Sequence, residues 1–220
     1  MERFKFVLGL FVLAVVLSLS VDANAQRRMI STREYMLPLS APKERSWDKS
    51  RREETTDETF ANGAVVKSVV TVNEVLLPDH SRYYSKETVD GVTTEFEQIK
   101  IDFMLYKRTN KGPWTKIDLR GSGGTGSGNG TGAGISRLCD QYSVEDVVIN
   151  SKQAKLYEAI VITSDTNELK FNEVRRWVSD TGLPYREEEV SGKLSPREET
   201  KCTVTTYEYD PNIKIEAPIK

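Results

Sequence analysis

The stretch RRWVSDTGLPYREEE, residues 175–189, decides the fold class because it predicts a corner between two strands rather than a catalytic loop. Asp180–Gly182 supplies turn residues, since glycine adopts positive φ without steric cost and aspartate bonds to the nearby backbone. Pro184 has no N–H, so it suits the first residue of a strand, where no ladder hydrogen bond is needed. The corner therefore predicts an antiparallel hairpin of residues 171–178 and 183–190.

Runs rich in β-branched and aromatic residues continue on both sides of this corner, and each is bounded by turn residues. Such runs predict strands. Asp90–Gly91 between two of them is a strong hairpin signal, because a tight turn needs positive φ there. Apolar parity changes after Phe96, which predicts a bulge or a break near Glu97–Gln98. The predicted strands are residues 64–77, 81–89, 92–101, 114–119, 142–149, 156–163, 171–178, 183–190 and 199–209.

These runs predict a mainly β chain, with a single antiparallel domain over residues 46–220. A sheet of about ten strands must curl or split into two sheets. Residues 26–45 read as a flexible lead-in that has room for a short helix. The charged residues 46–59 fit either a helix or a polar edge strand, and the sequence does not decide between them.

A glycine-rich segment, GSGGTGSGNGTGAG at residues 121–134, interrupts the strands. Glycine-rich segments also form phosphate-binding loops, but this one lacks the GK[ST] ending and no helical pattern follows it. A chain this rich in glycine does not fix its backbone cheaply. We therefore predict a disordered loop between two strands.

The first 25 residues have the layout of a secretory signal peptide. Arg3 and Lys5 precede the uncharged run of residues 6–19, and Ala23–Ala25 offers small residues to a signal peptidase. The apolar run is short for a membrane span, which needs about 20 residues, although an uncleaved anchor remains the alternative. We expect cleavage, a periplasmic or secreted product, and no transmembrane segment afterwards.

The chain has two cysteines, Cys139 and Cys202. Oxidising compartments favour disulfides, and an unstrained bridge across this loop would stabilise the fold by roughly 4 kcal/mol. We predict the disulfide, with two buried free thiols as the alternative. Their spacing does not suggest a metal site.

Composition and motifs argue against several classes of function. The 31 basic and 33 acidic residues give a net charge of −2, so no concentrated positive surface for nucleic acid is expected. His80 is the single histidine and stands beside turn residues, where a solvated side chain is more common than a catalytic one. Glu187–Glu189 reads as a solvated strand face rather than a cation site. We therefore predict that the protein is not an enzyme and binds no cofactor. An unrecognised hydrolase is the weaker alternative hypothesis.

Two C-terminal stretches, WVSDTGLPYREE (residues 177–188) and TTYEYDPNIKIEAP (residues 205–218), resemble periplasmic carriers of outer-membrane lipoproteins, the LolA-like group. The matching motifs include Trp177, the TGLP corner, Arg186 and Glu188. Two earlier segments, NEVLLPDHSRYY (residues 73–84) and LYKRTNKGPWTKI (residues 105–117), extend the likeness. The resemblance implies an open half-barrel sheet around an apolar cavity, closed by a few short helices, that holds acyl chains.

A carrier of acyl chains requires a dry apolar wall rather than reacting groups. The central apolar positions expected on that wall are Val70, Val72, Ile99, Ile101, Phe103, Ile160, Ile162 and Trp177. The same residues could instead pack together as an ordinary core, because alternation does not say which face is concave. The first hypothesis is a carrier or chaperone that binds acyl chains of lipids or lipoproteins. Envelope proteins are further candidate partners. The alternative is a cell-envelope protein-interaction module with a filled core.

Overall fold

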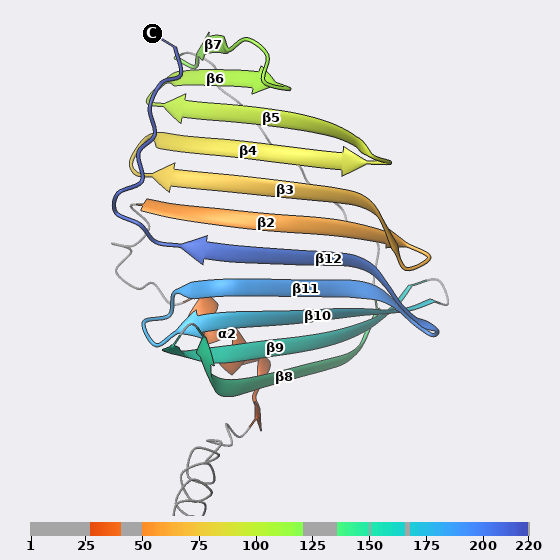
Figure 1. The fold of residues 1–220 in the computed structure, drawn as a ribbon. Helices are drawn as coiled ribbons and strands as arrows, with labels where there is room; N and C mark the ends of the chain where they lie inside the picture. Colours follow the sequence, from red (N-terminus) through yellow and green to blue (C-terminus); the bar gives the residue numbers. More distant parts are fainter. Residues whose placement is uncertain (1–26, 41–49, 121–135, 150, 166–167, 220) are drawn as a thin grey trace, which may run out of the picture.

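The computed structural model describes residues 27–40, 50–120, 136–149, 151–165 and 168–219. These residues form one open antiparallel sheet of 12 strands with one short helix. Figure 1 shows the strands lying side by side in a single layer, with the helix α2 behind the lower strands. The mainly β, open antiparallel half-barrel that the sequence predicts is confirmed, with 12 strands in place of about ten.

The sheet order is β1-β8-β9-β10-β11-β12-β2-β3-β4-β5-β6-β7. The elements are β1 (Arg28–Met29), α2 (Thr32–Ser40), β2 (Ser50–Ala61), β3 (Ala64–Leu76), β4 (His80–Val89), β5 (Val92–Ile101), β6 (Met104–Thr109), β7 (Thr115–Asp118), β8 (Ser136–Ile149), β9 (Lys152–Asp165), β10 (Glu168–Ser179), β11 (Pro184–Leu194) and β12 (Arg197–Glu208).

The charged segment, for which the sequence allowed a helix or an edge strand, forms strand β2. This strand lies in the middle of the sheet rather than at an edge. Its polar side chains find partners on both neighbouring strands. The Thr55 hydroxyl lies 3.0 Å from that of Thr205 on β12, and Arg52 donates to Glu74 on β3 over 3.3 Å. Cross-strand pairs of this kind stabilise a sheet, so a charged segment is accepted at its centre.

Two turns follow the predicted chemistry. Asp90 and Gly91 both have positive φ, 50° and 79°, and join β4 to β5, as the hairpin signal predicts. The corner of the opening stretch is also confirmed, since β10 ends at Ser179 and β11 begins at Pro184. There the Leu183 amide donates to the Ser179 hydroxyl over 2.8 Å, which closes the corner.

The predicted bulge or break near Glu97–Gln98 is wrong, because β5 pairs continuously with both neighbours there. The parity changes because Phe96 lies beside Tyr83 on the face opposite to that of Ile99 and Ile101. The break in the chain comes later, at a hairpin turn of Asp102 and Phe103, where Asp102 has a φ of 52°. A bulge does occur between Ser191 and Gly192, inside β11. A Cβ at Gly192 would lie 1.9 Å from the Glu198 carbonyl oxygen, so the close approach of the two strands requires glycine.

The two faces of the sheet are covered at opposite ends by different segments, which gives each face its name. On the helix face, Tyr35 of α2 packs against Tyr142 and Tyr157, near the β8 end. On the tail face, Ile213 and Ile215 of the C-terminal segment pack in a cluster with Ile99, near the β6 end. Figure 1 shows this segment crossing the ends of β3 to β6 in front of the sheet.

The described fold begins before residue 46, where the domain was expected to start. Strand β1 pairs with β8 through Arg28 and Met29, and α2 carries Tyr35, which is 6 % exposed. The short helix left open for residues 26–45 is therefore present and packs on the sheet. The predicted signal peptide and the glycine-rich segment lie outside the described residues.

The predicted disulfide is wrong, because Cys139 and Cys202 are both free. Cys139 lies on β8 and Cys202 on β12, with β9, β10 and β11 between them. Four strand spacings amount to about 19 Å, whereas a disulfide needs its Cα atoms within about 7 Å. Burial raises the pKa of the Cys202 thiol, so this side chain stays protonated and apolar in character.

Candidate ligand-binding site

Strand register places seven of the eight predicted wall residues on the tail face. Directly opposite residues of an antiparallel pair share a face, and so do alternate residues of one strand. Following the pairs from β9 to β6 therefore assigns every position to a face. The seven residues are Val70, Val72, Ile99, Ile101, Ile160, Ile162 and Trp177.

Phe103 is the exception, and its prediction as an inward-facing residue is wrong. It lies in the turn between β5 and β6, and 62 % of its surface is exposed. The apolar alternation of Ile99, Ile101, Phe103 and Leu105 put Phe103 on the same face as Ile101, although Asp102 and Phe103 form a turn. A turn residue follows neither face of the sheet.

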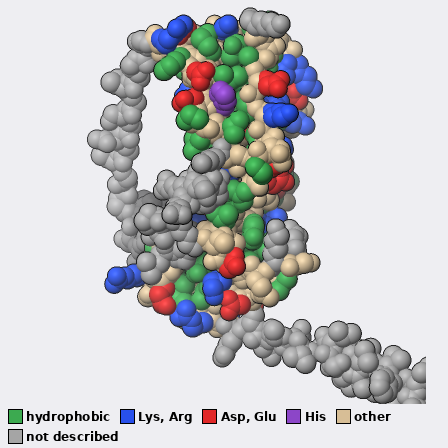
Figure 2. Space-filling view, turned by 90° about the vertical axis from the view of Figure 1, so that its left-hand side faces the viewer, with side chains coloured by type: hydrophobic (Ala, Val, Ile, Leu, Met, Phe, Trp, Pro, Cys, Tyr) green, Lys and Arg blue, Asp and Glu red, His purple; other side chains and the backbone are tan. Residues whose placement is uncertain are grey.

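Ile99 and Ile101 are covered by the protein's own C-terminal segment. Ile99 is 6 % exposed and Ile215 is 7 % exposed, and Ile101 and Ile213 pack around them. Figure 2 shows hydrophobic side chains gathered along this end of the strands, beside the single histidine. This part of the tail face is thus a small filled core rather than an open wall.

The other half of the tail face carries an apolar strip that runs diagonally across the strands from β9 to β3. Most of its members alternate along their strands or lie opposite one another, and Thr56 on β2 links Val204 to Val70. Between β10 and β11 the step is diagonal, because Phe171 lies opposite Gly192 and Val190 lies opposite Glu173. All of them except Phe171 are half-buried. The apolar strip consists of Ile160, Ile162, Phe171, Val190, Cys202, Val204, Thr56, Val70 and Val72.

Trp177 shares the tail face but stands outside the apolar strip. The guanidinium of Arg186 lies 6.0 Å from the Trp177 ring centre and donates to Glu188 over 2.8 Å. Arg175, on the same face, pairs with Glu158 over 3.2 Å and approaches Glu188 at 3.9 Å. This row of charges separates Trp177 from Ile160, so Trp177 does not extend the strip.

The helix α2 covers the opposite face from the predicted wall. Tyr35 packs over Tyr142, and burial raises the pKa of Tyr35. Away from the helix, the centre of the helix face carries hydroxyls, with Thr205, Thr55 and Thr71 in one register row. Within the described residues, the one helix therefore does not lie over the predicted wall residues, where the family resemblance implies helical closure.

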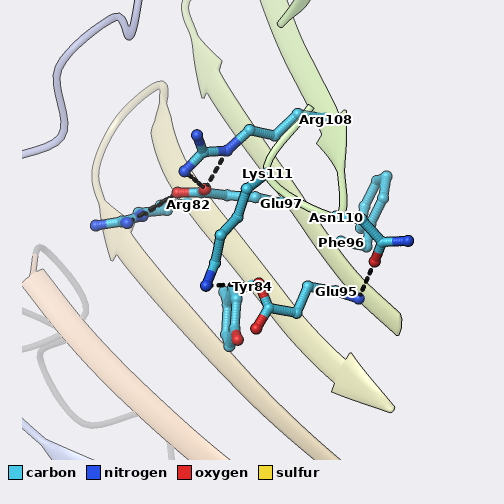
Figure 3. Close-up of a pocket in the computed structure, with 8 residues that line it drawn as sticks. All are labelled: Arg82, Tyr84, Glu95, Phe96, Glu97, Arg108, Asn110 and Lys111. Atoms are coloured by element: carbon cyan, nitrogen blue, oxygen red, sulfur yellow. Dashed lines mark hydrogen bonds and ion pairs between the residues drawn. The ribbon is translucent and has the colours of Figure 1, made fainter. Parts of the chain in front are cut away.

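A pocket of about 190 Å³ lies at the β4–β6 side of the sheet. Figure 3 shows its eight lining residues and the ion pairs among them. Arg82 and Tyr84 come from β4, and Lys111 comes from the turn that follows β6. The remaining lining residues are Glu95, Phe96, Glu97, Arg108 and Asn110.

Glu97 is the centre of this pocket and is held by two arginines. Its side chain is 8 % exposed, against 46 % for Arg82 and 30 % for Arg108. Arg82 donates to Oε1 through Nε and Nη2 at 3.0 and 2.8 Å, and Arg108 donates to Oε2 through Nε at 2.7 Å. Charge-assisted bonds to both oxygens fix both guanidinium planes. The ring of Trp114 lies 4.5 Å from the Arg108 guanidinium carbon, which holds it further.

Tyr84 and Asn110 add neutral polar groups to the pocket. Burial raises the pKa of Tyr84, and the negative charge of Glu95 and a hydrogen bond to its carboxylate raise it further, so the Tyr84 hydroxyl stays protonated and donates to Glu95. The Asn110 side-chain oxygen accepts from the Glu95 amide over 2.8 Å, which ties the turn to β5. The pocket therefore combines two fixed guanidinium groups with a hydroxyl that is bonded to Glu95.

The residues considered for catalysis are not assembled into a site. His80 begins β4, and its Nε2 lies 3.9 Å from an Asp102 oxygen, at the end of the sheet. Glu187 pairs with Arg176 and Glu188 pairs with Arg186, so these two glutamates are held in ion pairs with arginines. Within the described residues, no group of three or more metal-binding side chains comes together.

Sequence reasoning missed the pocket altogether. Its charges come from β4, β5, β6 and the turn after β6, and in the sequence they look like an ordinary polar strand face. The one signal was the position of Glu97 within a run of apolar alternation, which implies a buried carboxylate. A buried carboxylate needs cationic partners, but only strand register shows which arginines supply them.

A scan of protein-family models finds no match to this chain, and a search of curated proteins finds no relative. The LolA-like resemblance therefore rests on the sequence motifs alone. Among the residues that the structure describes, no helix is both long enough and apolar enough to cross a membrane.

Proposed function

We propose that this protein is a non-catalytic carrier or chaperone of the cell envelope that binds acyl chains of a lipid or lipoprotein along the apolar strip. One observation carries the proposal: apolar residues of β9, β11, β12 and β3 share one face of an open sheet and remain half-buried, and Phe171 of β10, which is buried, lies among them. The predicted signal peptide and the LolA-like motifs support the compartment and the class of cargo.

The length of the apolar strip suits an acyl chain. From β9 to β3 it crosses five strand spacings, which is about 24 Å. One leaflet of a bilayer has a hydrocarbon thickness of about 15 Å, so a single acyl chain fits along the strip. Covering apolar surface yields roughly 25 cal/mol per Å², which makes an elongated apolar contact sufficient for binding without any reacting group.

Two adjacent valines of β3 provide a matched test. Val70 lies in the apolar strip, whereas Val69 lies on the helix face opposite Glu87, and both are half-buried. Val70→Gln should weaken binding of a fluorescent fatty acid at least tenfold, and Val69→Gln should leave it near the wild-type value. Circular dichroism on both variants checks that the sheet is intact. Equal affinities of the two folded variants would count against the strip as the binding wall.

The alternative, a protein-interaction module with a filled core, is favoured by the C-terminal segment. That segment already occupies the tail face over Ile99 and Ile101. Native mass spectrometry of the mature protein, purified from its own envelope, separates the two functions. Bound lipid or acylated peptide near one per chain supports the carrier. A clean protein mass, unchanged after incubation with lipid, supports the module.

A further inference from the structure

We propose that the pocket around Glu97 binds the phosphate-type head group of an amphipathic cargo whose acyl chain lies on the apolar strip. This inference rests on the proposed function and adds the chemical class of the cargo, a phospholipid or another acylated phosphate. It is carried by the position of the pocket, by its charge and by its size.

The pocket begins where the apolar strip ends. Val72, the last member of the strip, lies directly opposite Tyr84 of β4, and Tyr84 lines the pocket. Tyr84 in turn lies opposite Glu97, and Glu97 lies opposite Arg108. Four neighbouring strands thus lead from an apolar residue to a cationic one on the same face. An amphipathic ligand could follow this row with its chain over Val72 and its head group at Arg108.

The lining of the pocket carries a net positive charge. Arg82, Arg108 and Lys111 supply three cations, and Glu95 and Glu97 supply two carboxylates, which leaves a balance of +1. A guanidinium has five N–H donors, and its planar fork matches phosphate oxygens. Each arginine directs its Nε and one N–H of its Nη2 at Glu97, and Arg82 Nη1 also approaches Glu74 at 3.8 Å. The other Nη2 hydrogen of each arginine and the Nη1 group of Arg108 remain as donors for a ligand.

Glu97 prepares the pocket for an anion instead of competing with one. Its two oxygens are each bound by one arginine, so the carboxylate cannot swing outward without leaving both guanidinium groups. Fixed donors lose little entropy when a ligand arrives, which favours binding. Lys111 is 76 % exposed and its Nζ lies 3.6 Å from Glu95 Oε2, so the rim of the pocket carries one further cation for a bound oxyanion.

The size of the pocket points to a head group rather than to a whole molecule. Sites that enclose drug-sized ligands have volumes of about 300–1,000 Å³. The volume of about 190 Å³ is smaller than that range and is walled mainly by polar side chains. It therefore suits a single phosphate group with its first substituent, while the remainder of the cargo lies outside on the sheet.

Short-chain probes test this inference on the mature protein. The probes are dihexanoyl phosphatidic acid, dihexanoyl glycerol and inorganic phosphate, with affinities measured by titration calorimetry at low and high salt. We expect the phosphatidic acid to bind at least tenfold more tightly than the uncharged diacylglycerol, with the difference reduced by salt. Inorganic phosphate alone should bind far more weakly than either lipid.

Two lysines provide the variant and its control. Lys111→Gln should weaken phosphatidic acid binding about two- to fivefold without changing diacylglycerol binding, because an exposed ion pair contributes up to about 1 kcal/mol. Lys107→Gln should change neither, since Lys107 lies opposite Gln98 on the helix face.

The outcomes separate this inference from the proposed function. Equal binding of the two lipids, abolished by Val70→Gln, would overturn the head-group site and keep the acyl carrier. Inorganic phosphate bound as tightly as phosphatidic acid would assign the pocket to free phosphate and overturn the lipid cargo. The absence of binding by all three probes would overturn both proposals.

Discussion

Ile99 on β5 and Ile215 in the C-terminal segment bury one another in a single cluster, at 6 % and 7 % exposure. The end of the chain therefore belongs to the core, although it forms no strand there. With the packing of α2 on the other face, this contact explains how a single-layer sheet keeps both of its ends covered.

The first prediction concerns this contact. Ile215→Ala should lower the free energy of unfolding by about 2–4 kcal/mol, because removing a buried aliphatic side chain loses transfer free energy and leaves a cavity. Urea unfolding followed by tryptophan fluorescence measures it. Ile219→Ala is the control, since Ile219 is 38 % exposed and should change stability by less than about 0.5 kcal/mol. Equal stability of Ile215→Ala and wild type would mean that the segment is not docked in solution.

The second prediction concerns the helix. Tyr35→Ala should undock α2, because Tyr35 is 6 % exposed and its ring centre lies 5.0 Å from that of Tyr142. Hydrogen exchange should then become fast in residues 32–40, while β10 and β11 stay protected. Arg33→Ala, an exposed position on the same helix, should leave the exchange slow. Fast exchange of the helix in the wild-type protein would contradict the packed arrangement.

The third prediction concerns Gly192. A methyl group there would lie 1.9 Å from the backbone oxygen of Glu198, and backbone cannot yield as the end of a side chain does. Gly192→Ala should therefore destabilise the protein by about 1–3 kcal/mol, the usual cost of overpacking. The midpoint of thermal unfolding measures the effect. Ser191→Ala, on the other side of the same bulge, should lie close to the wild-type midpoint.

The fourth prediction concerns the cysteines. Cys139 and Cys202 lie four strand positions apart, so the purified protein should bind two equivalents of a thiol reagent after denaturation without reductant. Adding dithiothreitol should not shift the urea midpoint. One or no labelled thiol per chain, confirmed as an intramolecular bridge by peptide mapping, would contradict the strand order of the structure.

The sequence predicts those features that depend on interactions between residues close together in the chain. The corner at Asp180–Gly182 and the turn at Asp90–Gly91 were predictable because turn chemistry is local. The β class was predictable because β-branched runs between turns leave few alternatives. The turn at Asp102 and Phe103 was not, because Phe103 continues the apolar alternation of its neighbours and conceals the break.

The candidate sites depend on pairing between distant strands, and the sequence does not encode that pairing locally. Alternation predicts that Val70 and Val72 share a face, and that Ile160 and Ile162 share a face. It does not predict whether the two pairs lie on the same face of the sheet. Only the register through β10, β11, β12 and β2 places all four together. The same register separates Cys139 from Cys202 and brings Arg82 and Arg108 onto Glu97. Local propensity thus determined the strands, whereas the sum of cross-strand contacts decided the faces, the filled end and the pocket.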